Sequence, residues 1–421
     1  MYAVLSRDAV ELLCRSVTGI GSVLAMADLE IRTPEADDIP ALLDLRTQAF
    51  GGRREQWGPA ELTPPLERAV AAFAGDRPVG TVYVLDFQQW FGGRKVRCGG
   101  VAGVTVAPDQ RGRGVARRLL AEATTRMRTD GAVVSALFPT SASLYRGLGW
   151  EVAGWWAQRS VTTSELPRPT GEVDWVPVDR SDPVLAELFE SMAKRRDGWV
   201  VPPHDWWAAH AARSAMPGAD PSWSWLGRRG EEAVAAVTYG HRSSQRAMFD
   251  LEAELIAGVD GSALTDALAL LGAHGTTAGQ TITTLPERLL AAHLDQPSRT
   301  RTSFDWPWML RLVDLPGAMA ARGWPEGVTA RVHLDVAGPR VADPAGASGR
   351  WVLEVADGEA SCTPGGDGTV RLPVGTLAAL YAGGASPEAL AYDGTLTGAD
   401  QSTIDALRIA FAGEPTLPTF F

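Results

Sequence analysis

The most constraining feature of the chain is a strand–turn–helix pattern between residues 101 and 120. Val101–Val106 is an apolar run that predicts a buried strand, and Pro108 ends it. A turn rich in glycine and arginine follows and leads into a helix with apolar periodicity. The turn has the spacing Arg111-x-x-Gly114-x-Ala116. The pattern therefore predicts an α/β unit in which a strand delivers the chain directly to a helix N-terminus.

The glycines of this turn leave room for a ligand beside the backbone. Gly112 and Gly114 lack the side chains that would keep a ligand away from the main chain. The first N–H groups of the helix have no partner within the helix, and the helix dipole favours an anion there. A pyrophosphate is the expected guest of such a turn. The alternative is an ordinary strand–turn–helix unit with arginines on its surface.

A second buried strand and a short helix are expected downstream. Ala132–Pro139 is again an apolar run, and the hydroxyl-rich segment Thr140–Ser143 predicts the start of a helix. Tyr145 lies within this helix, and Gly147 or Gly149 ends it. The spacing of Tyr145 from the first motif suggests a functional residue. The alternative is a core aromatic residue whose hydroxyl has a structural partner.

Together the two motifs resemble the acetyl-CoA-binding region of the GNAT N-acetyltransferase superfamily. In that family a tyrosine at the place of Tyr145 faces the CoA sulfur, so the resemblance implies a general acid. Attack of an amine on a thioester expels a thiolate, and a phenol with a pKa near 10 is able to protonate it. The strand end would align the pantetheine, and the turn would hold the pyrophosphate. The cofactor-binding residues implied are Val104, Thr105, Val106, Arg111, Gly112, Arg113, Gly114, Ala116, Thr140 and Ser141.

Length and composition indicate a soluble protein of about three domains. The chain has 421 residues, of which 45% are hydrophobic and 21% charged. No apolar stretch is long enough to predict a membrane span, and the segment 1–25 is a poor signal peptide. That segment is either an N-terminal extension or the result of a misplaced start. Three widely separated cysteines argue against a disulfide framework, so we expect a cytoplasmic protein.

The charge balance restricts the class of partner. Lys and Arg number 39 against 50 Asp and Glu, which gives a net charge of −11. This argues against nucleic acid as a ligand and is compatible with a polycationic substrate, although acidity also serves solubility alone. The six histidines show no paired metal-ligand spacing, so no metal is expected.

Residues 26–165 form the first expected domain, and residues 166–300 look like a degenerate copy of it. In the copy, helices are expected at 184–195 and 262–271, with strands at 233–239 and 248–256. The turn before the second helix lacks the Arg-x-x-Gly-x-Gly/Ala spacing, and Asp260 would place a negative charge beside a pyrophosphate. The copy is therefore predicted not to bind CoA. An unrelated α/β domain is the alternative.

The last segment, residues 301–421, predicts a further α/β domain. It opens with Trp306–Gly323, interpreted as a helix on each side of Pro316. Strands at 328–336, 350–355 and 369–373 and helices at 374–381 and 400–411 follow. The segment from Thr376 to Asp400 resembles a sterol-carrier-protein-like domain.

Two GNAT-like domains, the second degenerate, followed by a sterol-carrier-like domain resemble the architecture of Eis-type (enhanced intracellular survival) acetyltransferases. The resemblance implies a homo-hexamer that acetylates primary amines, including aminoglycosides, with acetyl-CoA as co-substrate. It also implies that the C-terminal carboxylate enters the active site of the first domain. Phe421 is the matching terminal residue, although Phe420 stands where an acidic residue is expected, which puts polyamine selectivity in doubt.

The terminal carboxylate is a plausible base. A protonated amine cannot attack a thioester, so a carboxylate must take or relay its proton. An α-carboxylate has a low ordinary pKa, near 3.5, and burial beside Phe420 and Phe421 would raise it. The alternative is a tail held by two aromatic residues that takes no part in catalysis.

The interpretation is thus an acetyl-CoA-dependent amine N-acetyltransferase that works by direct transfer in a ternary complex. Tyr145 would be the acid and the Phe421 carboxylate the base. The loop Phe50–Trp57 and several tryptophans would contribute to an acceptor pocket, although most tryptophans are expected in the core. Two alternatives stay open: a lipid- or sterol-binding protein, and a non-catalytic acyl-CoA sensor. The tryptophans considered for the pocket are Trp57, Trp90, Trp206, Trp207 and Trp308.

Overall fold

The computed structural model describes residues 29–51, 65–201, 221–339 and 343–421. The chain divides into two compact units, residues 1–84 with 102–123, and residues 85–101 with 124–421. Two strands and one helix, β3 (Arg77–Phe91), β4 (Arg94–Val106) and α3 (Val115–Thr129), have residues in both units. The expected N-terminal extension, residues 1–25, lies outside the described part of the chain.

The first unit is built on a sheet in which β1 (Leu29–Arg32), β2 (Ala69–Ala74), the first part of β3 and the last part of β4 follow one another. Strand β2 lies between β1 and the first part of β3, with Leu29 opposite Ala74 and Ala69 opposite Tyr83. The helix α2 (Ile39–Phe50) packs on β2 through Leu42 and Leu43. Every side chain of β2 from Ala69 to Phe73 is fully buried, so this strand is the core of the unit.

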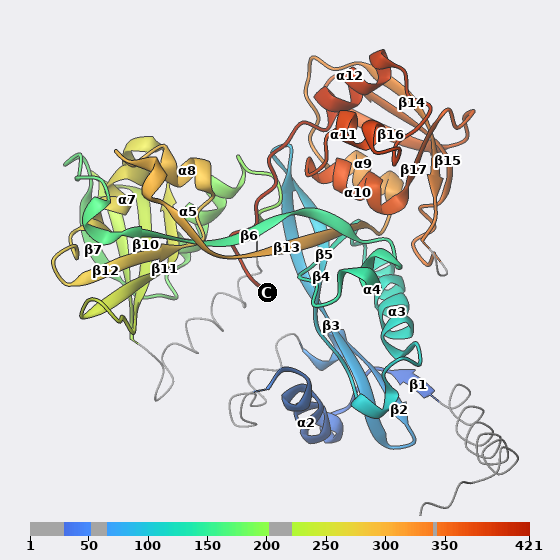
Figure 1. Ribbon diagram of the computed structural model, residues 1–421, viewed down its shortest axis with the longest axis horizontal. Helices are drawn as coiled ribbons and strands as arrows, with labels where there is room; N and C mark the ends of the chain where they lie inside the picture. Colours follow the sequence, from blue (N-terminus) through green and yellow to red (C-terminus); the bar gives the residue numbers. More distant parts are fainter. Residues whose placement is uncertain (1–28, 52–64, 202–220, 340–342) are drawn as a thin grey trace, which may run out of the picture. The chain divides into compact units, whose positions relative to one another are not determined.

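The second unit contains a large mixed sheet (Figure 1). Its strands follow the order β4-β5-β13-β6-β12-β11-β10-β9-β7, and β8 pairs with the last part of β3. Only the pairs β4–β5 and β11–β12 are parallel among the described pairs of this sheet. The strands not yet given are β5 (Val134–Leu137), β6 (Glu151–Thr162), β7 (Asp174–Val178), β8 (Val200–Val201), β9 (Ser222–Arg229), β10 (Glu232–Arg242), β11 (Phe249–Gly258), β12 (Ala278–Thr283) and β13 (Arg301–Leu312).

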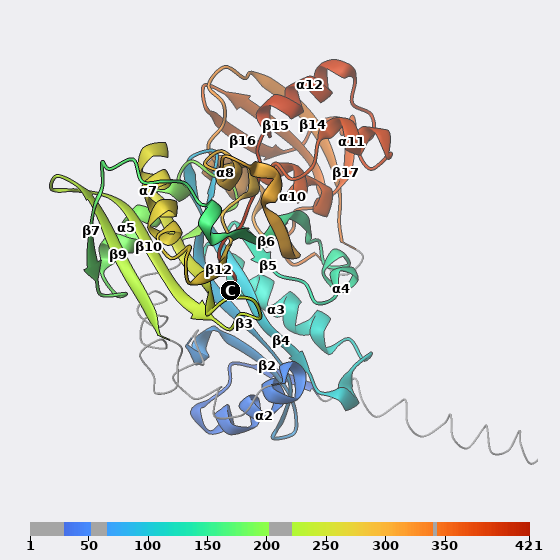
Figure 2. The same cartoon turned by 60° about the vertical axis from the view of Figure 1, so that its left-hand side comes forward.

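Strands β7 and β9–β12 form one end of this sheet and carry the helices expected for the degenerate copy (Figure 2). Helices α5 (Pro183–Ala193) and α7 (Gly261–Gly272) pack on β10 and β11 through a shared apolar core. Asp182 caps α5 by accepting a hydrogen bond from the Val184 N–H. A short helix, α8 (Glu287–Ala291), follows β12. The elements predicted for this region are confirmed.

One expected helix is a strand. The segment from Trp306 to the residue before Pro316 was predicted to be helical, but it forms most of β13, between β5 and β6. Trp308, Met309 and Leu310 are fully buried, in the part of β13 where β6 on one edge is joined by β5 on the other from Met309 onward. A continuous apolar run occurs equally in a buried strand and in a buried helix, so periodicity did not separate them. The helix after Pro316 is confirmed as α9 (Leu315–Ala321).

The C-terminal region forms a separate four-stranded sheet in the order β16-β15-β14-β17. Three of its strands and two of its helices match the predictions, whereas β16 and α11 were not predicted. The elements are β14 (Ala330–Ala337), β15 (Gly349–Ala356), β16 (Glu359–Pro364), β17 (Val370–Pro373), α10 (Val374–Ala382), α11 (Pro387–Tyr392) and α12 (Gln401–Ala410). Short 3-10 turns complete the fold at Ala36–Asp38, Leu66–Arg68, Pro108–Gln110, Thr163–Glu165 and Pro297–Arg299.

None of the helices in the described ranges is both long and apolar enough to cross a bilayer.

A close backbone approach joins β3 to the segment that follows α9. The Gly323 N–H donates to the Phe91 carbonyl over 3.1 Å, and Gly92 has a left-handed φ of 57°. A Cβ built on Gly323 would overlap the carbonyl group of Gly92, and one on Gly92 would overlap that of Gly323. Only glycine fits at both positions.

We therefore expect Gly323→Ala to lower the free energy of unfolding by about 1–3 kcal/mol, because backbone atoms must move apart. Gly327→Ala is the matched control, since a Cβ there meets no atom within 4 Å and is expected to change stability by less than about 0.5 kcal/mol. Urea unfolding of both variants measures the difference. Equal stability of the two would contradict the close approach.

Candidate functional site

The turn between β4 and α3 is open on the side where a ligand would approach. Gly112 and Gly114 have left-handed φ values of 76° and 79°, and a Cβ on either would meet no heavy atom within 4 Å. Arg111 and Arg113 are exposed at the same turn. Since α3 begins at Val115, its first N–H groups lie directly after the turn. The turn thus combines free space, backbone donors and positive charge.

The charges around this turn remain positive because its one carboxylate is neutralised. The Arg77 guanidinium lies 2.5 Å from Asp109 and holds the pKa of that carboxyl below its usual range. Arg111 folds back so that its Nε donates to the Val106 carbonyl over 3.3 Å. A guanidinium held beside the helix N-terminus suits phosphate oxygens.

Strand β4 is irregular where it approaches the turn. Gly103 has a φ of 57°, which interrupts the strand as a β-bulge does. Beyond it, Val104 and Val106 are half-buried while Thr105 is buried, so alternate side chains face opposite sides of the strand. The strand β5, paired with β4 from Cys98 to Val101, ends at Leu137. The remainder of β4 therefore has no parallel neighbour in β5. Two parallel strands that stop pairing in this way form a splayed pair.

Tyr145 lies in α4 (Ala142–Arg146), which begins after Ser141 and is followed by Gly147, as predicted. Its side chain is only 4% exposed, and burial raises its pKa to about 12. The ring meets Trp150 edge to face, with centroids 6.2 Å apart. Thr140 and Ser141 are exposed at the start of this helix. The phenol therefore stays protonated throughout the neutral and mildly alkaline range.

A buried arginine fixes the segment that follows Tyr145. Arg311 of β13 is 1% exposed, donates to the Leu148 carbonyl, and lies 3.2 Å from a carboxylate oxygen of Asp343. Its guanidinium also lies over the Trp150 ring, 4.9 Å from the centroid. Burial lowers the pKa of Arg311 to about 10, so it remains charged at neutral pH. The sequence predictions missed this residue because they assigned a helix to its segment.

The C-terminal tail is held along β6 and the segment before β8. The Thr416 N–H donates to the Asp197 carbonyl over 3.0 Å, and Trp199 Nε1 donates to the Thr416 hydroxyl over 2.8 Å. Trp156 Nε1 donates to the Pro418 carbonyl over 3.2 Å. Leu417, between these points, is 1% exposed. The tail is thus anchored before its last three residues.

The final two residues meet the end of β5. The Phe420 ring stacks on Phe138 with centroids 4.5 Å apart, and Phe421 contacts Phe138 edge to face at 5.4 Å. Phe421 also lies edge to face on Phe87, 4.9 Å between centroids. Phe138 directly follows β5 and precedes Tyr145 by one short segment of chain. The terminal residue is therefore held against the loop that leads to α4.

The predicted site residues divide between the two units. Those of β4 and the turn belong to the first, whereas Thr140, Ser141, Tyr145 and Phe421 belong to the second. Among the tryptophans considered for a pocket, Trp90 and Trp308 are core residues. Tryptophans that contact the tail include Trp155, Trp156, Trp199 and Trp306, and no sequence pattern indicated these contacts. Residues 52–57 of the expected acceptor loop, Trp206, Trp207, His204 and His210 lie outside the described ranges.

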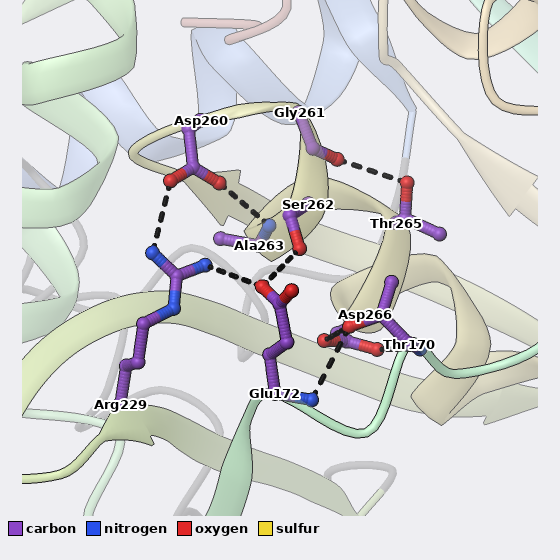
Figure 3. Close-up of polar contacts among 9 residues, drawn as sticks. All are labelled: Thr170, Glu172, Arg229, Asp260, Gly261, Ser262, Ala263, Thr265 and Asp266. Atoms are coloured by element: carbon purple, nitrogen blue, oxygen red, sulfur yellow. Dashed lines mark hydrogen bonds and ion pairs between the residues drawn. The ribbon is translucent and has the colours of Figure 1, made fainter.

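The corresponding turn in the degenerate copy is occupied by carboxylates (Figure 3). Asp260 accepts from the Ala263 N–H over 2.8 Å and pairs with Arg229 at 3.1 Å. Glu172 accepts from the Ser262 hydroxyl over 2.7 Å and lies 3.4 Å from Arg229. Carboxylates of the protein itself thus already interact with the N-terminus of α7, in the place where an external anion would bind.

Within the described ranges, no group of three or more His, Cys, Asp and Glu side chains is placed to hold a metal ion.

Comparison with known proteins matches two parts of the chain to family models. Residues 30–153 match the acetyltransferase (GNAT) domain, and residues 315–418 match the sterol carrier protein domain. A GCN5-related N-acetyltransferase of Kribbella flavida, a solved structure, is 30% identical, with a TM-score of 0.79 over 94% of this chain and 98% of that one. The N-acetyltransferase Eis of Mycobacterium tuberculosis is 25% identical over 92% of this chain and 98% of its own length. An uncharacterized N-acetyltransferase of Streptomyces griseus is 28% identical over 76% of this chain and 80% of its own.

Because Leu417 is buried between the anchored residues, we expect Leu417→Ala to release the tail. The lost burial, about 2 kcal/mol or more, should raise the rate at which carboxypeptidase removes Phe421 by at least about thirtyfold. Ile409→Ala, at a 46% exposed position of α12, is the control and should leave that rate unchanged. Equal digestion of both variants and the unmodified protein would show that the tail is not held there.

Proposed function

Because the chain belongs to the GNAT N-acetyltransferases of the Eis type, we propose that it transfers the acetyl group of acetyl-CoA to a primary amine. The match to the acetyltransferase domain and the relatives named N-acetyltransferase show that the chain is an acyltransferase. The observation that supports this co-substrate most directly is the turn at Gly112 and Gly114, where free space, backbone donors and arginines coincide. Aminoglycosides are the acceptor class proposed by family resemblance.

The residues of the first unit fit the co-substrate. The Arg111–Gly114 backbone and the two arginine side chains would hold the pyrophosphate, and the rest of the turn up to Ala116 would lie against it. Val104, Thr105 and Val106, in the part of β4 that extends beyond its pairing with β5, would align the pantetheine. Thr140 and Ser141 at the start of α4 are proposed as further contacts. Acetyl-CoA supplies the activated acetyl group.

Tyr145 is proposed as the general acid. Its buried hydroxyl, with a pKa near 12, still carries its proton when the thiolate departs. A thiol has a lower ordinary pKa than this phenol, so the hydroxyl would first donate a hydrogen bond to the developing thiolate charge, and α4, Trp150 and Arg311 hold it in place for that contact. No step requires Tyr145 to ionise beforehand.

The Phe421 carboxylate is proposed as the base that takes the proton from the acceptor ammonium. Its ring is held by Phe87 and Phe138, and the anchored tail limits where the carboxylate lies. Direct transfer in a ternary complex requires only this acid and this base. The amine would attack the thioester carbon as its proton moves to the carboxylate.

Further properties are proposed on the resemblance alone. The domain division is residues 26–165 for acetyl-CoA, 166–300 for a degenerate copy that binds no CoA, and 301–421 for a sterol-carrier-like domain that ends in the catalytic tail. A cytoplasmic homo-hexamer is the assembly that such relatives imply. Asp260 and Glu172 support the lack of CoA binding in the copy, because a pyrophosphate there would meet two carboxylates.

We expect Tyr145→Phe to lower kcat for acetyl transfer by about 100- to 10,000-fold, since a general acid is lost. The raised pKa predicts that kcat of the unmodified protein does not fall between pH 8 and pH 10 through ionisation of this residue. Release of the CoA thiol, followed with aminoglycosides and diamines, measures both. Tyr392→Phe, at a 95% exposed tyrosine, is the control. A fully active Tyr145→Phe variant would exclude the acid role.

Deletion of Phe421 is expected to reduce kcat at least about 100-fold, because the terminal carboxylate then ends one residue short of its place. Phe421→Leu keeps the carboxylate in register and should retain most of the activity. The same thiol-release assay compares the two. Loss of activity in Phe421→Leu equal to that in the deletion would assign the effect to the ring rather than to the carboxylate.

A further inference from the structure

In the degenerate copy, as in the first domain, two parallel strands stop pairing before the longer one ends and leave a cleft between them. Strands β11 and β12 pair from Phe249 opposite Ala278 to Ala253 opposite Thr283, where β12 ends. Strand β11 continues to Gly258, just as β4 continues beyond the end of β5. The copy therefore has the same splayed pair as the first domain, although its phosphate turn is filled by Asp260 and Glu172.

A cavity of about 250 Å³ lies at this splay. One wall is formed by Glu252 and its neighbours on β11, and another by the segment that follows β12. Helix α5 contributes Phe189, and β6 contributes Trp156. Trp199 and the tail residue Phe420 complete an aromatic lining. Such a concave site, with aromatic and aliphatic walls interspersed with polar side chains, is typical of a small-molecule pocket.

The charged side chains that line the cavity determine which ligand charge it favours. Arg180 forms a two-point ion pair with Glu254 and donates to the Ser222 hydroxyl over 2.8 Å, so its charge is already matched. Glu252 is half-buried, and its polar contact is the Gln158 amide at 3.4 Å. Among the described residues, no basic side chain forms an ion pair with Glu252. The cavity thus carries one uncompensated negative charge.

We propose that this cavity in the second domain binds an organic cation, an ammonium group attached to an aromatic or apolar body. The ammonium pairs with the Glu252 carboxylate, which otherwise remains half-buried without a counter-ion. The rings of Trp156, Phe189 and Trp199 line the cavity and offer apolar area to the body of the cation. The site is distinct from the acetyl-transfer residues and does not depend on the proposed reaction.

A ligand in the cavity would contact the C-terminal tail directly. Pro418, Thr419 and Phe420 line it, and Trp156 also donates to the Pro418 carbonyl. A bound cation therefore restrains the segment that ends at Phe421. Occupancy of the second domain would stabilise the position of the terminal carboxylate without contributing a group to catalysis.

The test is a calorimetric titration of the full chain, without acetyl-CoA, using 2-phenylethylamine as the cation. Its matched analogues are 2-phenylethanol, which is neutral, and 3-phenylpropionate, which is anionic. We expect the amine to bind and both analogues to bind at least about tenfold more weakly. Glu252→Gln keeps the side-chain shape and should weaken amine binding at least about tenfold. Glu326→Gln, at an exposed turn of the C-terminal domain, should not change it.

Deletion of Phe421 separates this site from the acceptor site. Amine binding that persists in the deletion and is lost in Glu252→Gln supports the cavity. Binding that is lost in the deletion but unchanged in Glu252→Gln would overturn the proposal, because the cation would then lie at the end of the tail. Equal binding of the anion, or absence of amine binding, would also overturn it. Acetyl transfer plays no part in these outcomes, so failure of the proposed function would leave them unaffected.

Discussion

The insertion of β13 between β5 and β6 is the constraint on which much of the second unit depends. Where β13 has a partner on each edge, at Met309 and Leu310, its backbone is hydrogen-bonded within the sheet and its side chains are buried. The insertion also places the Arg311 guanidinium inside the protein, where leaving it unpaired would be costly. Its partners are the Leu148 carbonyl and the Asp343 carboxylate, so the buried charge determines the position of the chain immediately after Tyr145.

The same strand region explains how a chain terminus can become part of a site. Trp156 of β6 and Trp199 donate their indole N–H groups to the tail, at Pro418 and Thr416. With the buried Leu417 between them, the tail loses the freedom that chain ends usually have. The aromatic contacts of Phe421 with Phe87 and Phe138 then act on a segment that is already ordered. A terminal carboxylate held in this way has a defined place, which a base requires.

How far the sequence predicts this structure differs between its parts. The helix around Tyr145 and the strand–turn–helix at Val101–Leu120 follow from local signals, namely periodicity, caps and glycines, so they were predictable. The strand β13 was not, because an apolar run alone does not distinguish a buried strand from a helix. The contacts of the tail with Trp156 and Trp199 depend on long-range packing, for which a single sequence holds no signal.

Comparison of the two parallel strand pairs shows how charge separates the roles of two similar domains. At the first turn, Asp109 is neutralised by Arg77, and the open glycines face exposed arginines, which favours a phosphate anion. At the second turn, Asp260 and Glu172 supply the anion, and α7 has no need of an external one. Because carboxylates of the protein occupy the turn before α7, the cleft of the second domain need not be positively charged. Glu252 in an aromatic cavity makes that charge negative, so the two clefts favour ligands of opposite sign.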